Sequence, residues 1–297
     1  QVRREDVQSD FDPPKGAVHG FAKEGDGAWQ KRLMTAVSED GVHFRKTNAV
    51  VTDQGNVPDF ILGDEGVLYL YYSAGIAGDR NNVMAVAISF DAGETWVFKY
   101  VVIEGTEGMG PPGDPDVRRL EDGTFRLFFT SGERGSRIPA IFYAEGTDGI
   151  HFTMQGAAFR VGEEPVLDSF TVPIGETWHM YTLDAGGGAL WHGVSMDGKT
   201  FTSAGTARFS VDGRPYIPTN EMMLEDRSVR FYAFRPGRGG DIRSFLTRDG
   251  FEWEAEEGVV LEVDEGSGLE KDYVKDVSVV KLPSGEYLMA YVTVIPE

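Results

Sequence analysis

The sequence predicts an all-β fold, a five-bladed β-propeller with four antiparallel strands in each blade. Three observations predict it. A short turn pattern occurs five times, a second pattern occurs five times between its copies, and the chain begins and ends in the middle of a repeat. A four-stranded unit that recurs about every 50 residues is typical of a propeller blade. We therefore expect a single domain over residues 1–297, although chain length alone would favour two domains.

The turn pattern is an aspartate followed by a glycine and then by an aromatic residue. Its five aspartates lie 51, 57, 49 and 52 residues apart and are Asp40, Asp91, Asp148, Asp197 and Asp249. Each copy lies between two short apolar runs, so the Asp-Gly pair predicts a tight hairpin turn. We interpret these aspartates as structural, with the carboxylate bonding the turn backbone and the aromatic ring packing between blades.

The second pattern is a polar residue, an apolar run, a turn and a second apolar run. It predicts the inner strand of each blade and the strand beside it. The polar residues are Asp59, Asp116, Asp168, Asn220 and Asp276. In the first four copies the polar residue stands seven positions before the turn residue, and the fifth copy carries two extra residues.

The order of the two patterns predicts how the ring closes. The chain opens with an outer half-blade (31–51) and closes with an inner half-blade (276–293), so both termini must build the last blade. We expect blades at about 53–102, 110–160, 164–210 and 215–262, with the last formed by 270–297 plus 30–52. Residues 1–29 are then an N-terminal extension.

Composition excludes several classes of protein. The chain has 28 Lys+Arg against 48 Asp+Glu, a net charge of −20, which argues against nucleic acid and against an anionic membrane surface. It has no cysteine, which excludes disulfides and thiolate chemistry. No apolar run approaches the roughly 20 residues of a spanning helix. We expect a monomer or small homo-oligomer, with a secreted or periplasmic location.

The starts of the inner strands should meet at one mouth of the central channel, where the five polar residues form a ring. The period of two along a strand places Asp114 on the same side as Asp116, and Glu221 directly follows Asn220. Carboxylates this close repel one another, so some must be protonated, paired with arginine or bound to a cation.

Three interpretations of this ring remain open. In the first, the residues cap loops by bonding backbone amides. Alternatively, carboxylate oxygens hold a calcium ion in the channel. In the third interpretation, two carboxyl groups act as acid and base on a glycosidic bond. The ligands of the calcium ion would be Asp59, Asp116, Asp168 and Asp276.

The same face should also carry the ends of the second strands and the starts of the third strands. Arginine and tryptophan there suit a polar, ring-shaped ligand such as a sugar, although they are equally typical of ordinary surface positions. The candidate substrate-binding residues are Asn220, Asp276, Arg137, Trp191, His192 and Arg235.

Residues 114–129, which begin Asp-Pro-Asp-Val and continue through Asp-Gly to an aromatic strand, resemble the inner strands of five-bladed glycoside hydrolases of families 43, 32, 68 and 130. The resemblance extends over about residues 30–295. The turn pattern resembles the Asp box of sialidase-type propellers. The resemblance implies a carbohydrate substrate and no required cofactor.

In family 43 an aspartate on the first inner strand is the general base, one on the second adjusts the pKa, and a glutamate on the third is the general acid. The resemblance places the first role on Asp59, which follows a proline where the family's aspartate precedes one, and the second on Asp114, with Asp116 beside it. The third inner strand has Asp168 in place of a glutamate.

The leading hypothesis is a glycosidase that acts on oligo- or polysaccharides, with Asp168 or Glu221 as the acid and Asp59 or Asp116 as the base or nucleophile. The alternative is a non-catalytic propeller that binds carbohydrate or calcium.

Overall fold

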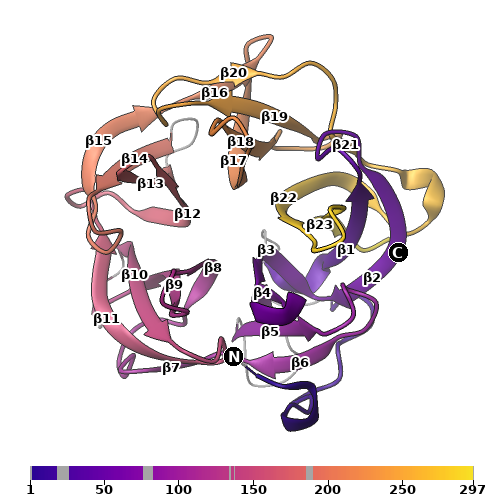
Figure 1. The fold of residues 1–297 in the computed structure, drawn as a ribbon, viewed down its shortest axis with the longest axis horizontal. Helices are drawn as coiled ribbons and strands as arrows, with labels where there is room; N and C mark the ends of the chain where they lie inside the picture. The colour runs from indigo at the N-terminus through magenta and orange to yellow at the C-terminus, as the bar shows by residue number, and fades with distance from the viewer. Residues whose placement is uncertain are drawn as a thin grey trace.

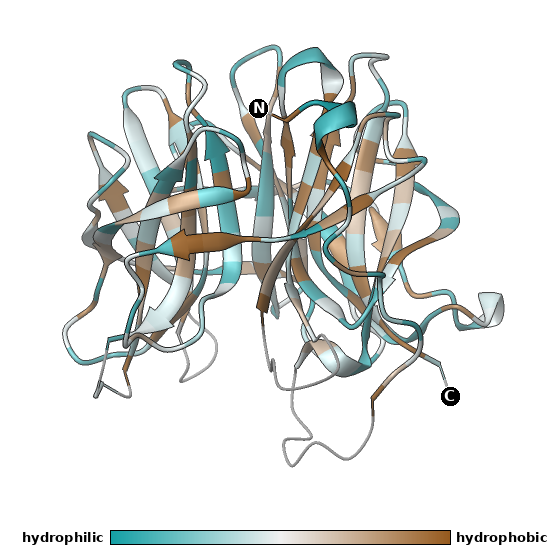
Figure 2. Cartoon of the chain, turned by 90° about the horizontal axis from the view of Figure 1, so that it is seen from below, coloured by the Kyte–Doolittle hydropathy of each residue, from teal (hydrophilic) through white to brown (hydrophobic). Residues whose placement is uncertain are grey.

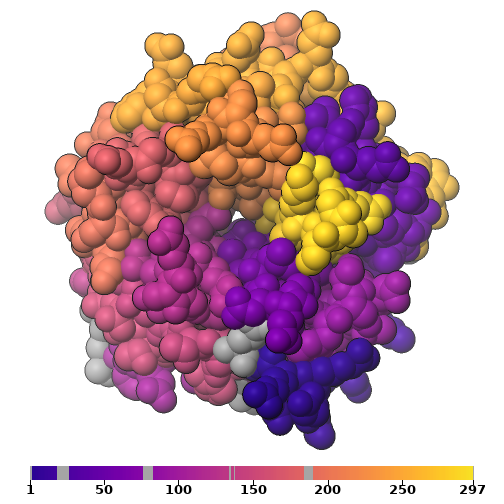
Figure 3. Space-filling model, viewed as in Figure 1, coloured from indigo at the N-terminus to yellow at the C-terminus, as the bar shows by residue number. Residues whose placement is uncertain are grey.

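The computed structural model describes residues 2–18, 27–75, 83–133, 135–136, 138–184 and 190–296. It is a ring of five antiparallel sheets around a central axis (Figure 1), which confirms the predicted five-bladed propeller. Seen along this axis, the space-filling surface leaves only a narrow opening at the centre of the ring (Figure 3). In the described residues no helix is long and apolar enough to cross a membrane.

Blades one to three follow the chain in order from the channel outward. Blade one consists of β3 (Gly55–Leu62), β4 (Leu68–Ala74), β5 (Val83–Ser89) and β6 (Val97–Tyr100). Blade two consists of β8 (Gly113–Arg119), β9 (Phe125–Gly132), β10 (Pro139–Gly146) and β11 (His151–Phe159), with β7 (Val102–Glu104) parallel to β11 at its outer edge. Blade three consists of β12 (Val166–Ile174), β13 (Thr177–Asp184), β14 (Leu190–Ser195) and β15 (Thr202–Ala207).

Blade four is more elaborate and blade five closes the ring. Blade four consists of β17 (Arg214–Met223), β18 (Val229–Phe234), β19 (Asp241–Thr247) and β20 (Glu254–Ala255), with β16 (Phe209–Val211) beside β17 and β21 (Leu261–Glu262) beside β19. Blade five takes β22 (Lys271–Lys281) and β23 (Tyr287–Val294) from the end of the chain, and β1 (Lys31–Ser38) and β2 (Arg45–Asp53) from its beginning. Both termini therefore build the closing blade, as the sequence predicts.

The connections outside the blades are short 3₁₀ turns and one covering segment. The turns are η1 (Arg4–Asp6), η2 (Ala28–Gln30), η3 (Asp64–Gly66) and η4 (Glu265–Ser267). The N-terminal segment runs along the outer strand of blade one, where the Asp10 amide donates to the Phe98 carbonyl (2.8 Å) and the Phe98 amide donates to Ser9 Oγ (3.1 Å). It thereby covers an edge strand that would otherwise offer unpaired backbone groups.

The core lies between the blades, where the faces of neighbouring sheets meet. Figure 2 shows hydrophobic and hydrophilic residues on the same strands. Strand β4 is buried at every position, because its sheet is packed on both faces. Tyr69, Phe125 and Phe128 are buried between blades one, two and three, and Tyr181, Phe209 and Phe231 are in contact between blades three and four.

The five aspartates of the turn pattern bond the backbone of their own hairpins. The Asp148 carboxylate, for example, accepts hydrogen bonds from the Ile150 and His151 amides, both at 2.8 Å. The same arrangement occurs at Asp40, Asp91, Asp197 and Asp249. Their carboxylates are occupied by turn amides, which agrees with a structural role.

A tyrosine on the second strand links three of the five blade junctions. Tyr71, Tyr181 and Tyr232 each donate a hydrogen bond to the carbonyl of a glycine in the next blade's hairpin, Gly149, Gly250 and Gly41, at 2.7, 2.6 and 2.7 Å. Blade two has Phe128 at this register position, and Arg126 Nη1 bonds the Gly198 carbonyl instead (2.9 Å). Blade five has Ala290 there, so the junction between blades five and one lacks this tyrosine.

We expect Tyr232→Phe to lower the free energy of unfolding by about 1–2 kcal/mol, because it leaves the buried Gly41 carbonyl without its donor. Urea unfolding at neutral pH measures the change. Tyr143→Phe is the matched control, since the Tyr143 hydroxyl makes no hydrogen bond within the described residues and its loss should cost less than about 0.5 kcal/mol. Equal losses in the two variants would show that the link does not stabilise the junction.

Candidate functional site

The starts of the five inner strands share a bulge. The pairing register skips between Asn56 and Asp59 in blade one and between Gly113 and Asp116 in blade two, and similar skips occur in the other three blades. Beyond the bulge, five residues occupy the same register position: Asp59, Asp116, Phe170, Asn220 and Ser278. Bulges re-aim side chains and often occur beside functional sites.

This register corrects part of the predicted ring. Asp168 and Asp276 do not share the position of Asp59 and Asp116; each lies two residues nearer the start of its strand, at the place of Asp114. In blade three, only two residues separate Ile174 from its partner Thr177, whereas five separate Leu62 from Leu68 in blade one. Because this turn is shorter, counting seven positions back from the turn residue of blade three gives Asp168, whereas the residue at the common register position is Phe170. In blade five, the constant spacing of seven before Gly285 indicates Ser278, not Asp276.

The place of Asp114 is strained in four of the five blades. Val57, Asp114, Asp168 and Asp276 have φ values of 48°, 54°, 48° and 41°. This left-handed region is uncommon for residues with a side chain, and especially for a β-branched valine. Such strain costs on the order of 1–3 kcal/mol and tends to occur at functional sites, which makes the channel mouth the candidate site.

Polar side chains at the common register position bond the neighbouring inner strand. Asp59 accepts hydrogen bonds from the Val117 amide (2.6 Å) and from Ser278 Oγ (3.2 Å). Asn220 accepts from the Val279 amide (2.8 Å) and donates to Ser278 Oγ (3.1 Å). Both oxygens of Asp59 are therefore engaged in holding strands together, and burial raises its pKa to about 7.

Asp116 differs from Asp59 because one of its oxygens has no partner. Its Oδ1 accepts a hydrogen bond from Thr171 Oγ1 (3.3 Å) and lies 3.2 Å from Arg118 Nη2. Its Oδ2 is buried without a hydrogen-bond partner in the described part of the chain. Burial raises the pKa of Asp116 well above its usual value, and the positive charge of Arg118 opposes this rise.

Arg118 crosses the channel and binds Glu221. Its two terminal nitrogens meet the two oxygens of Glu221 at 2.5 and 2.9 Å, and its Nε donates to Thr171 Oγ1 (3.0 Å). A bidentate ion pair of this kind engages both oxygens of the carboxylate. Burial raises the pKa of Glu221, while the adjacent guanidinium lowers it. Sequence analysis missed Arg118, although it follows Asp116 by two residues and the strand period places both on one side.

A second group of carboxyls lies at the strained position. Asp168 is hydrogen-bonded to the Asp114 side chain, and burial and the Asp114 charge raise the pKa of Asp168 well above its usual value. Asp276 is paired with Lys275 at 2.8 Å. Two carboxyl groups in contact cannot both be ionised without a large cost, which favours the protonated form of Asp168.

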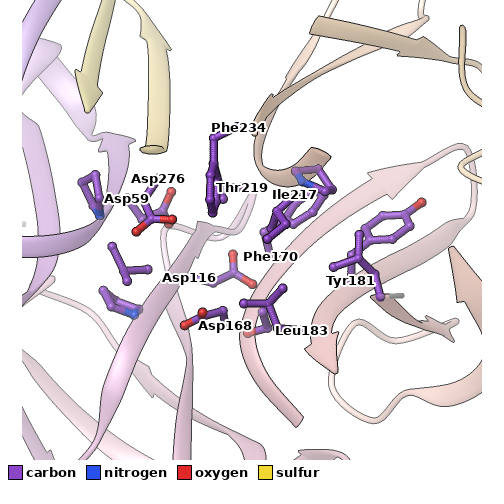
Figure 4. Close-up of a pocket in the computed structure, with 16 residues that line it drawn as sticks. Asp59, Asp116, Asp168, Phe170, Tyr181, Leu183, Ile217, Thr219, Phe234 and Asp276 are labelled. Atoms are coloured by element: carbon purple, nitrogen blue, oxygen red, sulfur yellow. The ribbon is translucent and has the colours of Figure 1, made fainter. Parts of the chain in front are cut away.

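A small cavity opens among these residues. It is lined on one side by Asp59, Asp116, Asp168 and Asp276, and on the other by apolar side chains that include Phe170, Leu183 and Ile217 (Figure 4). The space open to a water-sized molecule is about 20 Å³, enough for about one water. Among the described residues, no three acidic or histidine side chains are arranged to hold a metal ion.

The other candidate substrate-binding residues lie elsewhere, as far as the described residues show. Trp191 packs on the core between blades two and three, and Arg235 pairs with Asp241 (2.7 Å) in blade four. Neither residue lines the cavity. Arg137 lies outside the described residues.

His192 belongs to a buried histidine pair and also lies away from the cavity. Its Nε2 lies 2.9 Å from His179 Nδ1, and both rings stack on Tyr181 beneath Phe251. The two side chains are 3% and 1% exposed, so burial lowers both pKa values, that of His192 to about 4. The pair therefore packs blade three against blade four in its neutral form.

We expect this pair to make the protein less stable in mild acid. An unfolded histidine binds its proton near pH 6.5, whereas the folded pair resists protonation, so the stability it contributes is lost as pH falls from 6.5 toward 4. Between pH 7.5 and 5 the wild type should lose about 1–2 kcal/mol more than a His179→Asn/His192→Gln variant. Urea unfolding of both proteins at each pH measures this.

The comparison between the two proteins is needed because the buried carboxyls act in the opposite direction. Their raised pKa values mean that the folded state holds extra protons, and stability falls as pH rises toward 7. That contribution is common to both proteins. Parallel pH profiles would show that the histidines do not titrate with unfolding.

The fold and these side chains define a five-bladed propeller with a cluster of buried acids at one channel mouth. No protein-family model and no curated protein matches the sequence. Solved structures do match. A thermostable family-43 glycoside hydrolase aligns with a TM-score of 0.64 at 14% identity, over 81% of this chain and 88% of that chain.

Two further solved structures show the same likeness. An α-L-arabinofuranosidase from Lactobacillus brevis aligns with a TM-score of 0.59 at 9% identity, over 79% of this chain and 82% of that one. An endo-arabinase from Bacteroides thetaiotaomicron aligns with a TM-score of 0.56 at 16% identity, over 81% and 94%. The resemblance to five-bladed glycoside hydrolases that the sequence predicts is thus confirmed at the level of the fold.

Proposed function

We propose that this chain is a glycoside hydrolase that cleaves glycosidic bonds of oligo- or polysaccharides, with Asp116 as the base or nucleophile and Asp168 as the acid. One observation carries the proposal. Asp116 Oδ2 is buried, has no partner in the described part of the chain, and belongs to a side chain that lines the same cavity as Asp168. A glycosidase needs two carboxyl groups, one ionised and one protonated, on either side of the bond.

Asp116 suits the first role better than Asp59. Both oxygens of Asp59 are held by the Val117 amide and Ser278, and Asn220 makes the equivalent bonds in blade four without any charge. Arg118 next to Asp116 favours its ionised form, and burial makes that carboxylate a stronger base than one in water.

Asp168 suits the second role better than Glu221. Glu221 is held at both oxygens by Arg118, whereas burial and the Asp114 charge raise the pKa of Asp168 well above its usual value and so favour its protonated form. The Asp168 proton would pass to the glycosidic oxygen as the bond to the sugar carbon breaks. Asp116 would take a proton from the attacking water, or bond the sugar carbon itself before water releases it, and water is consumed once in either case.

The assignment of the acid predicts a dependence on the leaving group. Asp168→Asn should lower kcat/KM at least 100-fold on unmodified arabino- and xylo-oligosaccharides, whose leaving alcohol needs a proton. The loss should be below about 10-fold on the 4-nitrophenyl glycosides of the same sugars, because nitrophenolate leaves without one. Asp122→Asn, in an exposed turn, is the matched control and should match the wild type on both.

Three results would contradict the proposal: no hydrolysis of any glycoside by the wild type, full activity of Asp168→Asn, or equal losses on both kinds of substrate. Sugar binding without hydrolysis would favour the alternative, a non-catalytic carbohydrate-binding propeller. The small size of the cavity is the observation that supports this second candidate.

A further inference from the structure

A cleft between blades one and two lies beside the acidic cavity. Its open space is about 290 Å³, far more than the cavity itself. Asn56 and Asp114 line the cleft, while the residues that follow them, Val57 and Pro115, line the cavity. The two spaces are therefore neighbours separated by single residues at the start of β3 and β8.

The lining of the cleft is polar and small. Four glycines, one alanine and two prolines form much of its wall, and Ser73, Thr130 and Ser131 contribute hydroxyl groups. Among the residues that the structure describes, the lining includes no lysine, arginine or aromatic residue. Asp114, whose charge raises the pKa of Asp168, supplies the one carboxyl group of this described lining.

Two buried hydroxyls in this lining can still donate a hydrogen bond. Ser73 Oγ accepts the Asp114 amide (3.0 Å), and Thr130 Oγ1 accepts the Asp168 amide (3.1 Å). The Ser73 and Thr130 side chains belong to residues that are 7% and 8% exposed. Within the described residues, neither hydroxyl has an acceptor for its own proton. Each therefore retains a donor next to the cleft.

The glycines keep the cleft open. A Cβ placed on Gly113 would meet nothing closer than Ser73 Oγ at 3.8 Å, and one on Gly110 would meet nothing closer than the Gly132 amide nitrogen at 3.5 Å. Neither residue needs a left-handed backbone, so larger side chains would fit the main chain and fill the empty space.

These features select the chemistry of the ligand. A phosphate or other anion would face the Asp114 carboxyl and would meet no counter-charge among the described lining residues. A neutral ligand with many hydroxyl groups can use the Ser73 and Thr130 donors and the Asp114 oxygen at once. The volume is sufficient for one sugar ring, and pockets of this size hold small ligands.

We propose that the cleft between blades one and two is a subsite that binds a neutral sugar unit adjacent to the unit that contacts Asp116 and Asp168. This inference deepens the proposed function and rests on it for the identity of the substrate. A chain of two or more sugars then extends from these carboxyl groups into the cleft and gains affinity from the cleft.

Calorimetric binding tests this without turnover. Arabino- and xylo-oligosaccharides of one to five units are titrated into Asp168→Asn protein, with and without Gly113→Val. The Cβ of the valine meets no atom closer than 3.8 Å, so the side chain extends into the cleft. The position is on strand β8, and strands favour β-branched residues. Ala204→Val, on the exposed strand β15, is the matched control.

We expect Gly113→Val to weaken binding of at least one oligosaccharide 10-fold or more, to change binding of the monosaccharide less than twofold, and Ala204→Val to change neither. Gly113→Ala should give an intermediate loss, which guards against misfolding of the larger variant. Unchanged oligosaccharide binding in Gly113→Val, or no binding of any oligosaccharide to Asp168→Asn, would overturn the subsite. Binding that is sensitive to Gly113→Val in a protein whose wild type hydrolyses nothing would retain the subsite and refute the proposed hydrolase.

Discussion

Asp116→Asn is expected to lower kcat/KM on every substrate of the proposed hydrolase by about 1000-fold or more, with little change in fold. The substitution keeps the shape of the side chain but removes the charge on Oδ2, the buried oxygen that has no partner within the described residues. General acid–base groups typically contribute about 10²- to 10⁴-fold, and loss of a nucleophile costs at least as much. Steady-state hydrolysis of aryl glycosides measures the effect.

Asp59→Asn is the closest control for Asp116→Asn, because blade four already has an asparagine at the equivalent position. Asn220 occupies the same register position in blade four and bonds the next strand through its amide. An asparagine at position 59 can still accept the Val117 amide, and only the weaker bond from Ser278 Oγ is lost, so activity should fall less than about 10-fold. The substitution also removes a buried acid whose pKa is about 7. It should therefore reduce the loss of stability that the wild type shows as pH rises toward 7.

The pH dependence of kcat/KM also distinguishes the role of Asp116 from that of Asp59. If Asp116 is the base, the acid limb of kcat/KM reports its protonation, and Asp59→Asn should leave that limb in place. Full activity in Asp116→Asn, or equal losses at both positions, would assign the chemistry to another residue.

Arg118→Met is expected to lower the free energy of unfolding by about 3–5 kcal/mol. It leaves Glu221 and Asp116 buried without their counter-charge, and breaking a buried ion pair on one side costs this much. Urea unfolding at pH 7 measures the loss. Adding Glu221→Gln should restore part of it, because the uncompensated charge is then removed.

The neighbouring residue provides the control for this prediction. Arg119 also pairs with a carboxylate, Asp64, but the Asp64 side chain is 60% exposed. Arg119→Met should cost less than about 1 kcal/mol, as exposed ion pairs usually do. If Arg118→Met were no more destabilising than Arg119→Met, the pair across the channel would not be a major contributor to stability.

The fold could be predicted because its signals are local and repeated. Each Asp-Gly turn specifies its own hairpin, and five copies at a nearly constant interval specify the number of blades. The channel mouth could be located for the same reason, since Asp59, Asp116 and Asn220 do share one register position.

The details of the site depend on features that repeat less regularly. The short turn after Ile174 shifts Asp168 by two residues, and the bulge in each inner strand decides which side chains reach the mouth. Partners across the channel, such as Arg118 with Glu221, lie 103 residues apart in sequence, and no local pattern joins them. His192 faces the next blade because its strand is packed on both sides. The polarity of a histidine does not indicate on which face of such a strand its side chain lies.

The closing blade has a consequence for the order of folding. Lys31 pairs with Val294, so this sheet joins the two ends of the chain, while the other four sheets join segments close in sequence. Loop-closure entropy makes such long-range pairing the slow step, and during synthesis β1 and β2 must wait until the last strands have emerged. The pairing of β1 with β23 inside blade five is then the last step that closes the ring, and the ring opens wherever these two strands separate.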